Sequence, residues 1–203
     1  MYVLYHFPYS QHARRVHSLL EEARLVYRLE HVAMDQGDYL TANYLAVNPN
    51  HQVPSLVDEE TGVKIHESNA ILRYLCVKHA LDNWYPSDLV QRARVEQWLD
   101  WNQCRLSPHV VGIVLNSVFM GEDGDKDAIA RSHEAMKELS EILDAGLADR
   151  PYLAGDRATI ADLSVASNIF QLCLADAMPK QANINDWYAR ISQFDGFQKS
   201  LPT

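Results

Sequence analysis

The pattern of apolar and polar residues changes near residue 80 of this 203-residue chain. Before that point, short β-prone runs alternate with segments of helical periodicity, and after it only helical periodicity remains. Strands are expected at residues 2–7, 27–32, 53–58 and 62–66, and helices from residue 11, within 37–47 and over 68–79. The resulting order β-α-β-α-β-β-α is typical of an α/β domain.

The second part of the chain predicts helices only, after a loop rich in turn residues. Helices are expected over residues 89–119, 126–148, 159–177 and 185–194. Pro108 should kink the first of them, because proline cannot donate a backbone hydrogen bond inside a helix. The pattern therefore predicts an α/β domain at residues 1–79, a linker at 80–88 and an all-helical domain at 89–203.

Composition narrows the class of protein without identifying it. Hydrophobic residues make up 47% and charged residues 22% of the chain, as in ordinary globular proteins, and the net charge is −9. This charge argues against a nucleic-acid partner, which would favour a basic face. No apolar run approaches the roughly 20 residues of a membrane span, and the N-terminus lacks the pattern of a signal peptide, so we expect no membrane association.

The cysteines indicate a reducing compartment. They are odd in number, far apart and show no metal-binding spacing: Cys76, Cys104 and Cys173. We therefore expect a cytoplasmic protein without a metal, in which each thiol is buried as a small hydrophobic group.

Two neighbouring stretches offer chemistry for a ligand. Residues 48–58 read NPNHQVPSLVD, a turn followed by an extended run that Pro54 interrupts. Proline has no N–H for a ladder, so this run belongs at a strand start or a sheet edge. Glu67 and Ser68 then precede a helical pattern, where Ser is a favoured N-cap and the free N–H groups attract carboxylates. A backbone edge facing such a helix end would suit a small peptide-like acid.

These stretches, NPNHQVPSLVD followed by ESNAILRYL, resemble the glutathione-binding half of the cytosolic glutathione transferases. The resemblance implies a thioredoxin-like domain, a cis bond before Pro54, and pairing of the Val53 backbone with the cysteinyl part of glutathione. It also implies that Glu67 and Ser68 hold the γ-glutamyl carboxylate. His51 matches a position that reaches the glycine carboxylate, with Gln52 beside it, although a surface or capping histidine is the alternative.

The second half of the chain resembles the all-helical domain of the same family. YLAGDRATIADLSVAS is similar to its fold-defining segment, in which Thr159 caps a central helix and Asp162 follows three residues later. In dimeric members an acidic or amide side chain of the long helix reaches the γ-glutamyl amine across the interface. Asp100 matches that position, and its alternative is a solvated helix carboxylate. The resemblance thus covers nearly the whole chain and implies a homodimer.

The catalytic step requires a thiolate, and a hydroxyl that donates to the sulfur favours this charged form. Such a hydrogen bond contributes about 1.5–3 kcal/mol, which lowers the thiol pKa by about one to two units. Ser10 stands where the serine-type, theta-like classes carry their catalytic serine, and Arg14 matches the arginine that follows it. Ser10 is the first candidate, Tyr9 the second and Tyr5 the third. Ser10 can also cap a helix, since one hydroxyl both donates and accepts.

The resemblance implies an enzyme that transfers glutathione, its co-substrate, to a small hydrophobic electrophile, with a role in detoxification. The loop after the first strand and the long helix would wall the electrophile site, with Phe7, Trp101, Cys104 and Ser107 as candidates. The alternatives are a non-catalytic binding or scaffold module, or a glutathione-dependent peroxidase, dehalogenase or isomerase. The absence of cysteine at position 10 weighs against thiol-disulfide chemistry.

Overall fold

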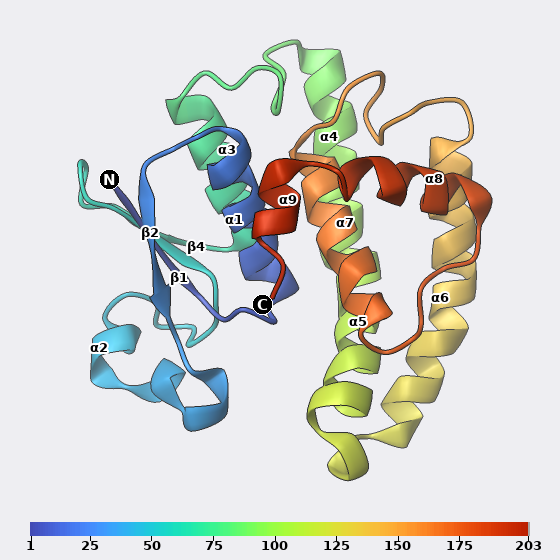
Figure 1. Ribbon diagram of the computed structural model, residues 1–203, viewed down its shortest axis with the longest axis horizontal. Helices are drawn as coiled ribbons and strands as arrows, with labels where there is room; N and C mark the ends of the chain where they lie inside the picture. Colours follow the sequence, from blue (N-terminus) through green and yellow to red (C-terminus); the bar gives the residue numbers. More distant parts are fainter. Residues whose placement is uncertain (203) are drawn as a thin grey trace. The chain divides into compact units, whose positions relative to one another are not determined.

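The computed structural model describes residues 1–202, which form two compact units (Figure 1). The first unit contains Met1–Asp82 together with the C-terminal segment that begins at Gln193, and the second contains Asn83–Ser192. The sequence pattern placed the segment from Gln193 in the helical domain, whereas in the structure it packs with the first unit.

The first unit is the expected thioredoxin-like α/β domain. Its elements are β1 (Tyr2–His6), α1 (Gln11–Glu22), β2 (Tyr27–His31), the 3-10 turns η1 (Met34–Gln36) and η2 (Asp38–Leu40), α2 (Ala42–Leu45), β3 (Ser55–Asp58), β4 (Lys64–His66), α3 (Ser68–Lys78) and α9 (Asp195–Lys199). The strand order is β2-β1-β3-β4, with β1 parallel to β2 and antiparallel to β3. β4 pairs antiparallel with β3. The predicted β-α-β-α-β-β-α order is confirmed.

Alternate side chains of β1 face different helices. The ring of His6 lies 6.4 Å from that of His17 on α1, whereas the ring of Tyr5 lies 5.8 Å from that of Tyr44 on α2. Because successive side chains of a strand point to opposite faces, α1 and α2 cover opposite faces of the sheet. The apolar core lies under α1 and α3 and includes Leu4, Val16, Leu19, Leu56, Leu72 and Leu75.

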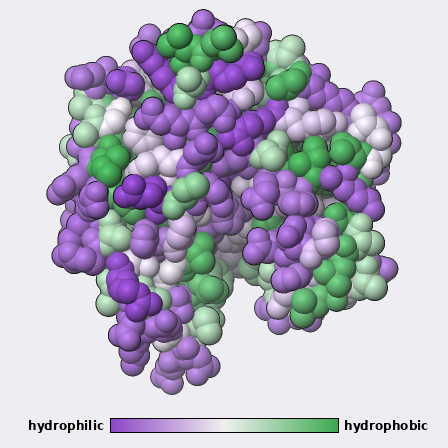
Figure 2. Space-filling model, turned by 180° about the vertical axis from the view of Figure 1, so that it is seen from behind, coloured by the Kyte–Doolittle hydropathy of each residue, from purple (hydrophilic) through white to green (hydrophobic). Residues whose placement is uncertain are grey.

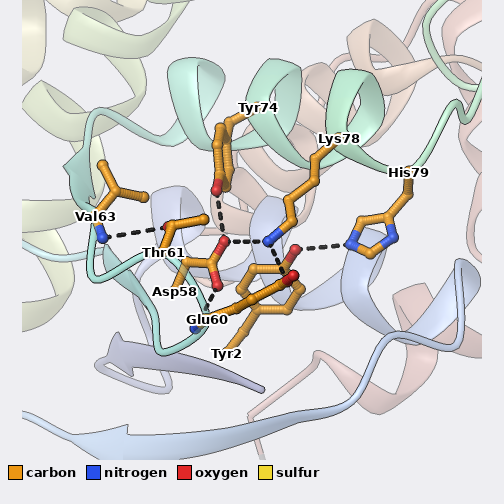
Figure 3. A network of polar contacts seen from close by, with 8 residues as sticks. All are labelled: Tyr2, Asp58, Glu60, Thr61, Val63, Tyr74, Lys78 and His79. Carbon is orange, nitrogen blue, oxygen red and sulfur yellow. Dashed lines mark hydrogen bonds and ion pairs between the residues drawn. The ribbon is translucent and has the colours of Figure 1, made fainter.

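A polar network fastens the C-terminal end of α3 to the β3–β4 hairpin (Figure 3). The Asp58 carboxylate accepts hydrogen bonds from Lys78 Nζ at 2.5 Å and from the Tyr74 hydroxyl at 2.5 Å. Lys78 also lies 2.7 Å from the Glu60 carboxylate on the hairpin. Since α3 starts directly after β4, this network fixes the far end of the helix whose first residue is Ser68.

Helix α9 packs against α1 through a close backbone approach. A Cβ on Gly196 would lie 2.6 Å from the Ser18 carbonyl oxygen, so only glycine fits without a shift. The Gly196 N–H donates to the Glu22 carboxylate at 2.6 Å, and Lys199 pairs with Glu21 at 2.7 Å. These contacts, with the buried ring of Phe197, explain why the chain end belongs to the first unit.

The second unit is a helical domain. Its elements are α4 (Leu89–Trp101), the π-helical η3 (Asn102–Leu106), α5 (Ser107–Val114), the π-helical η4 (Leu115–Phe119), the 3-10 turn η5 (Gly121–Asp123), α6 (Lys126–Leu147), α7 (Ile160–Cys173) and α8 (Ala182–Ile191). Residues 89–119 are thus helical throughout, as predicted. The irregularity expected at Pro108 takes the form of the π turn η3, and the proline occupies the first turn of α5, where its missing donor is tolerated.

The predicted capping box at the start of α7 is confirmed. The buried Asp162 carboxylate accepts from the backbone N–H groups of Thr159 at 2.8 Å and Leu153 at 2.9 Å. It also accepts from the Trp187 indole N–H at 2.8 Å, which ties α8 to α7. One carboxylate therefore joins the connector, α7 and α8, as a structural role requires.

Two expectations about side-chain burial were wrong. Cys76 is buried, but Cys104 and Cys173 are exposed. The face in Figure 2 is mostly hydrophilic, with apolar side chains in separate patches, as the net charge of −9 suggests. Among residues 1–202, no helix is both long and apolar enough to cross a membrane.

Candidate active site

Sheet pairing brings the two candidate ligand-binding stretches together. Ser55 of β3 lies opposite His66 of β4 in antiparallel register. Extending this register by two residues puts Val53 level with Ser68, the first residue of α3. The extended run and the helix start therefore meet at one end of the sheet, as the sequence predicted.

The loop after β1 reaches the same end of the sheet. Tyr5 near the end of β1 lies opposite Ser55 at the beginning of β3. The chain then turns, with the Ser10 N–H donating to the Phe7 carbonyl at 2.9 Å, and α1 begins. The N-termini of α1 and α3 thus both lie at this end, and their dipoles favour an anion there.

The backbone before β3 offers an unpaired edge. The Val53–Pro54 bond is cis, as the resemblance implies. The Gln52 carbonyl is held from inside by the Tyr44 hydroxyl at 2.6 Å and by Asn48 Nδ2 at 2.8 Å. The N–H and carbonyl of Val53 form no hydrogen bond with any residue in 1–202. A bound ligand could therefore pair with Val53 as a further strand would.

The start of α3 has donors without a partner among the described residues, although its cap differs from expectation. Ser68 is the first helical residue rather than the N-cap, and Glu67 occupies the cap position without a side-chain hydrogen bond to the helix. Glu67 adopts a left-handed backbone with φ of 68°, which is unfavourable for a residue with a Cβ. The Ser68 N–H and hydroxyl have no partner within residues 1–202. Strain of this kind is concentrated at functional sites.

Ser10 caps α1 and keeps a hydrogen to donate. Its Oγ accepts from the Ala13 N–H at 3.2 Å, so the capping alternative is correct. The hydroxyl proton is not used by that bond and remains available to a sulfur anion. Tyr9 is 41% exposed beside Phe7, and Tyr5 lies against Tyr44 on the α2 face of the sheet.

Histidines gather beside this loop without forming a metal site. The ring of His6 lies 6.4 Å from that of His17 and 6.0 Å from that of His31. Burial and these two neighbours lower the pKa of His6 to about 4, so its ring is neutral at pH 7. Residues 1–202 contain no group of three or more His, Cys, Asp or Glu side chains suited to holding a metal ion.

His51 and Gln52 lie exposed beside the unpaired edge. His51 also has a left-handed backbone, with φ of 47°, and its ring lies 6.5 Å from that of Tyr39. Two of the candidate residues, His51 and Glu67, are therefore among the few non-glycine residues with positive φ.

The remaining candidates lie on the helical unit. Asp100 is exposed on α4, and Cys104 is exposed on η3. Trp101 is half-buried, with its ring 5.1 Å from that of Trp98, and Ser107 is buried at the start of α5. All four fall at or beside the π turn, a distortion that is frequent at functional sites.

Sequence reasoning missed the residues that hold the site from inside. Tyr44 and Asn48 orient the Gln52 carbonyl, and Arg15 contacts Asn69 beside the start of α3. Asn48 gave a local signal, because its side chain accepts from the Asn50 N–H at 2.9 Å in an Asx turn before the site. The Arg15–Asn69 contact joins residues 54 positions apart and has no local signal.

Comparison with known proteins agrees with this geometry. Residues 4–83 match the model of the glutathione S-transferase N-terminal domain, and residues 126–191 match that of the C-terminal domain. Glutathione S-transferase GstB of Escherichia coli is 31% identical over 94% of this chain and 92% of its own length. Human glutathione S-transferase theta-2 is 30% identical over 92% of this chain and 79% of its own length.

Solved structures give the same result. The theta class enzyme of Xanthomonas axonopodis pv. citri, solved with glutathione bound, has a TM-score of 0.91 and 29% identity, covering 100% of this chain and 97% of that one. The chain belongs to the glutathione S-transferase family. Within it the protein is a theta-like glutathione transferase, as its motifs indicated.

Proposed function

We propose that the protein binds glutathione at this end of the sheet and activates its thiol for attack on a small hydrophobic electrophile. The observation that carries the proposal is the unpaired backbone of Val53, level with the unpaired N–H and hydroxyl of Ser68 at the start of α3. Glutathione supplies a matching peptide unit and a matching carboxylate. Its cysteinyl part would pair with Val53, and its γ-glutamyl carboxylate would accept hydrogen bonds from Ser68.

The other binding residues lie around these two contacts. Glu67 would hold the γ-glutamyl end together with Ser68, and Pro54 would shape the edge beside Val53. His51 and Gln52 lie exposed next to this edge and would reach the glycine end. Polar residues at both ends of the proposed site match a ligand that is polar at both ends and has its reactive sulfur in the middle.

Ser10 would stabilise the thiolate. Its Oγ is occupied as an acceptor by Ala13, so its O–H can donate to the glutathione sulfur, and the dipole of α1 favours the same negative charge. The thiol proton leaves to solvent, and a sulfur lone pair forms the new S–C bond. In a displacement, the leaving group departs with its bonding electron pair. In an addition, the π electron pair of the attacked double bond moves onto the acceptor, which then takes a proton from solvent. Tyr9 is the second candidate for this donor and Tyr5 the third.

The electrophile, the oligomeric state and the location belong to the same proposal. Phe7, Trp101, Cys104 and Ser107 are the electrophile-binding candidates. A homodimer would allow Asp100 to reach the γ-glutamyl amine of the partner's glutathione, and light scattering after size-exclusion would test this state. The three free thiols support a reducing, cytoplasmic compartment, where such an enzyme would serve detoxification.

Isothermal titration with glutathione tests the site. We expect micromolar to millimolar binding that weakens in Glu67→Ala and in Ser68→Ala. Ser18→Ala and Glu141→Ala are matched controls, because one removes the hydroxyl of a buried serine of α1 and the other an exposed glutamate of α6. Absence of binding by the wild type would favour a non-catalytic scaffold. Binding without transfer to halides, epoxides or enones, but with reduction of peroxides or with isomerisation, would assign a different glutathione-dependent reaction.

A further inference from the structure

One buried contact joins the first turn of α3 to the helix that begins after Ser10. Arg15 of α1 donates from Nη1 to the side-chain oxygen of Asn69 at 3.3 Å. Arg15 is fully buried and Asn69 is 7% exposed. Asn69 directly follows Ser68, so this contact acts on the turn whose N–H groups point to the proposed carboxylate.

The same contact brings positive charge close to the helix start. Burial and the neighbouring Arg14 lower the pKa of Arg15 to about 9, and the guanidinium therefore stays charged at pH 7. In a desolvated environment a charge acts over a longer distance than in water, because the effective dielectric constant is lower. Arg15 and the dipole of α3 therefore favour an anion at the same place.

We propose that Arg15 is a positioning residue of the glutathione site, which holds Asn69 and thereby orients the first turn of α3 toward the γ-glutamyl carboxylate. The inference rests on the proposed function, since it concerns the ligand group assigned to Glu67 and Ser68. Arg15 does not contact glutathione itself in this account. The donor in its hydrogen bond is the planar guanidinium, whose geometry a lysine cannot reproduce.

The test compares two ligands in titration calorimetry. One is glutathione, and the other is glutathione amidated at its γ-glutamyl α-carboxylate, which lacks the anion. In Asn69→Ala and in Arg15→Met we expect the Kd for glutathione to rise about tenfold, because a misplaced first turn of α3 would lose the equivalent of one hydrogen bond to the charged carboxylate. The Kd for the amidated ligand should stay within about twofold of the wild-type value. In turnover, Asn69→Ala should raise KM for glutathione and leave kcat unchanged.

Ser18→Ala serves as the control, because Ser18 is another fully buried polar residue of α1, one whose backbone carbonyl lies close to Gly196 of α9. It should bind both ligands as the wild type does. If Arg15→Met does not fold, Asn69→Ala decides the question.

Two results would overturn the inference. An equal loss of affinity for both ligands would mean a general structural effect rather than positioning toward the carboxylate. Unchanged glutathione binding in both variants would also contradict it. In that case Ser68→Ala separates the two levels: weaker binding in Ser68→Ala leaves the proposed glutathione site intact, whereas unchanged binding rejects both.

Discussion

The Asp58 carboxylate holds the end of α3 opposite to the proposed glutathione site, and its removal should destabilise the first unit. The side chain is 1% exposed and accepts from Lys78 at 2.5 Å, from Tyr74 at 2.5 Å and from the Glu60 N–H at 3.0 Å (Figure 3). Burial alone would raise the pKa of this carboxyl group, but the hydrogen bonds from Lys78 and Tyr74 outweigh burial and hold the pKa well below its usual range.

The cost of Asp58→Asn follows from these contacts. The amide keeps the volume and an acceptor for the Glu60 N–H, but it presents its own N–H groups to the donors Lys78 and Tyr74. Hydrogen bonds to a charged group contribute about 1.5–3 kcal/mol each. Lys78 keeps its ion pair with Glu60 and reaches solvent, so its share is discounted as for an exposed pair. We expect the free energy of unfolding to fall by about 2–3 kcal/mol, which moves the urea midpoint by about 1 M.

Urea unfolding of wild type, Asp58→Asn and Glu30→Gln measures this difference. Glu30→Gln is the control because Glu30 pairs with Arg28 at 2.6 Å on the surface, where both side chains are nearly half exposed. Since folding lowers the pKa of Asp58, its contribution is fully present above the unfolded value of about 3.9 and is lost as the pH falls through the folded value. The gap between wild type and variant should therefore shrink below about pH 4. A midpoint shift no larger than that of Glu30→Gln would refute the reasoning.

Further predictions concern other parts of the fold. Gly196→Ala should lower the free energy of unfolding by about 1–3 kcal/mol, because the added Cβ would lie 2.6 Å from the Ser18 carbonyl oxygen. An unchanged urea midpoint would show that α9 shifts freely. Asp162→Asn should lower the free energy of unfolding by about 3–5 kcal/mol in the same assay, because both carboxyl oxygens accept from buried donors and the amide replaces one of these acceptors with an N–H group; a loss below about 1 kcal/mol would contradict this. His6 should titrate in NMR near pH 4, because burial and the neighbouring imidazoles oppose its protonation. Stability should consequently fall as the pH drops from about 6.5, since the unfolded chain binds that proton first; a midpoint near 6.5 would count against this assignment.

The spacing of apolar residues predicted most of the helices and strands, because the residues of an element that face the core are apolar. The apolar spacing of α1 and the alternation of the strands gave the element order, and the cap at Thr159 marked the start of α7. Strand ends were less predictable: β3 begins at Ser55 rather than Val53, because Pro54 has no N–H for the ladder. Helix α9 was missed because its five residues are too few for a periodic signal and depend on contacts with α1.

The candidate site shows the same limit. The motif around Val53 and the Glu67–Ser68 pair could be predicted from the sequence, because each depends on residues that are neighbours in the chain. The sequence did not show that Glu67 is the N-cap of α3, because Ser68 has the higher N-cap propensity. In the structure Glu67 occupies the cap position at the β4–α3 junction, in a left-handed conformation. Arg15 was not predicted because its role depends on Asn69, 54 positions away.

The most direct test of the central claim is the pKa of the glutathione thiol in its complex with the protein. Ultraviolet absorbance of the thiolate, followed against pH, gives this value for the wild type and for Ser10→Ala. Our account predicts a wild-type value about one to two units below the free thiol's value of about 8.5, and a return toward 8.5 in Ser10→Ala with glutathione still bound. Equal values in both proteins would contradict the role of Ser10 and direct attention to Tyr9. An unshifted value in the wild type would contradict thiolate activation at this site altogether.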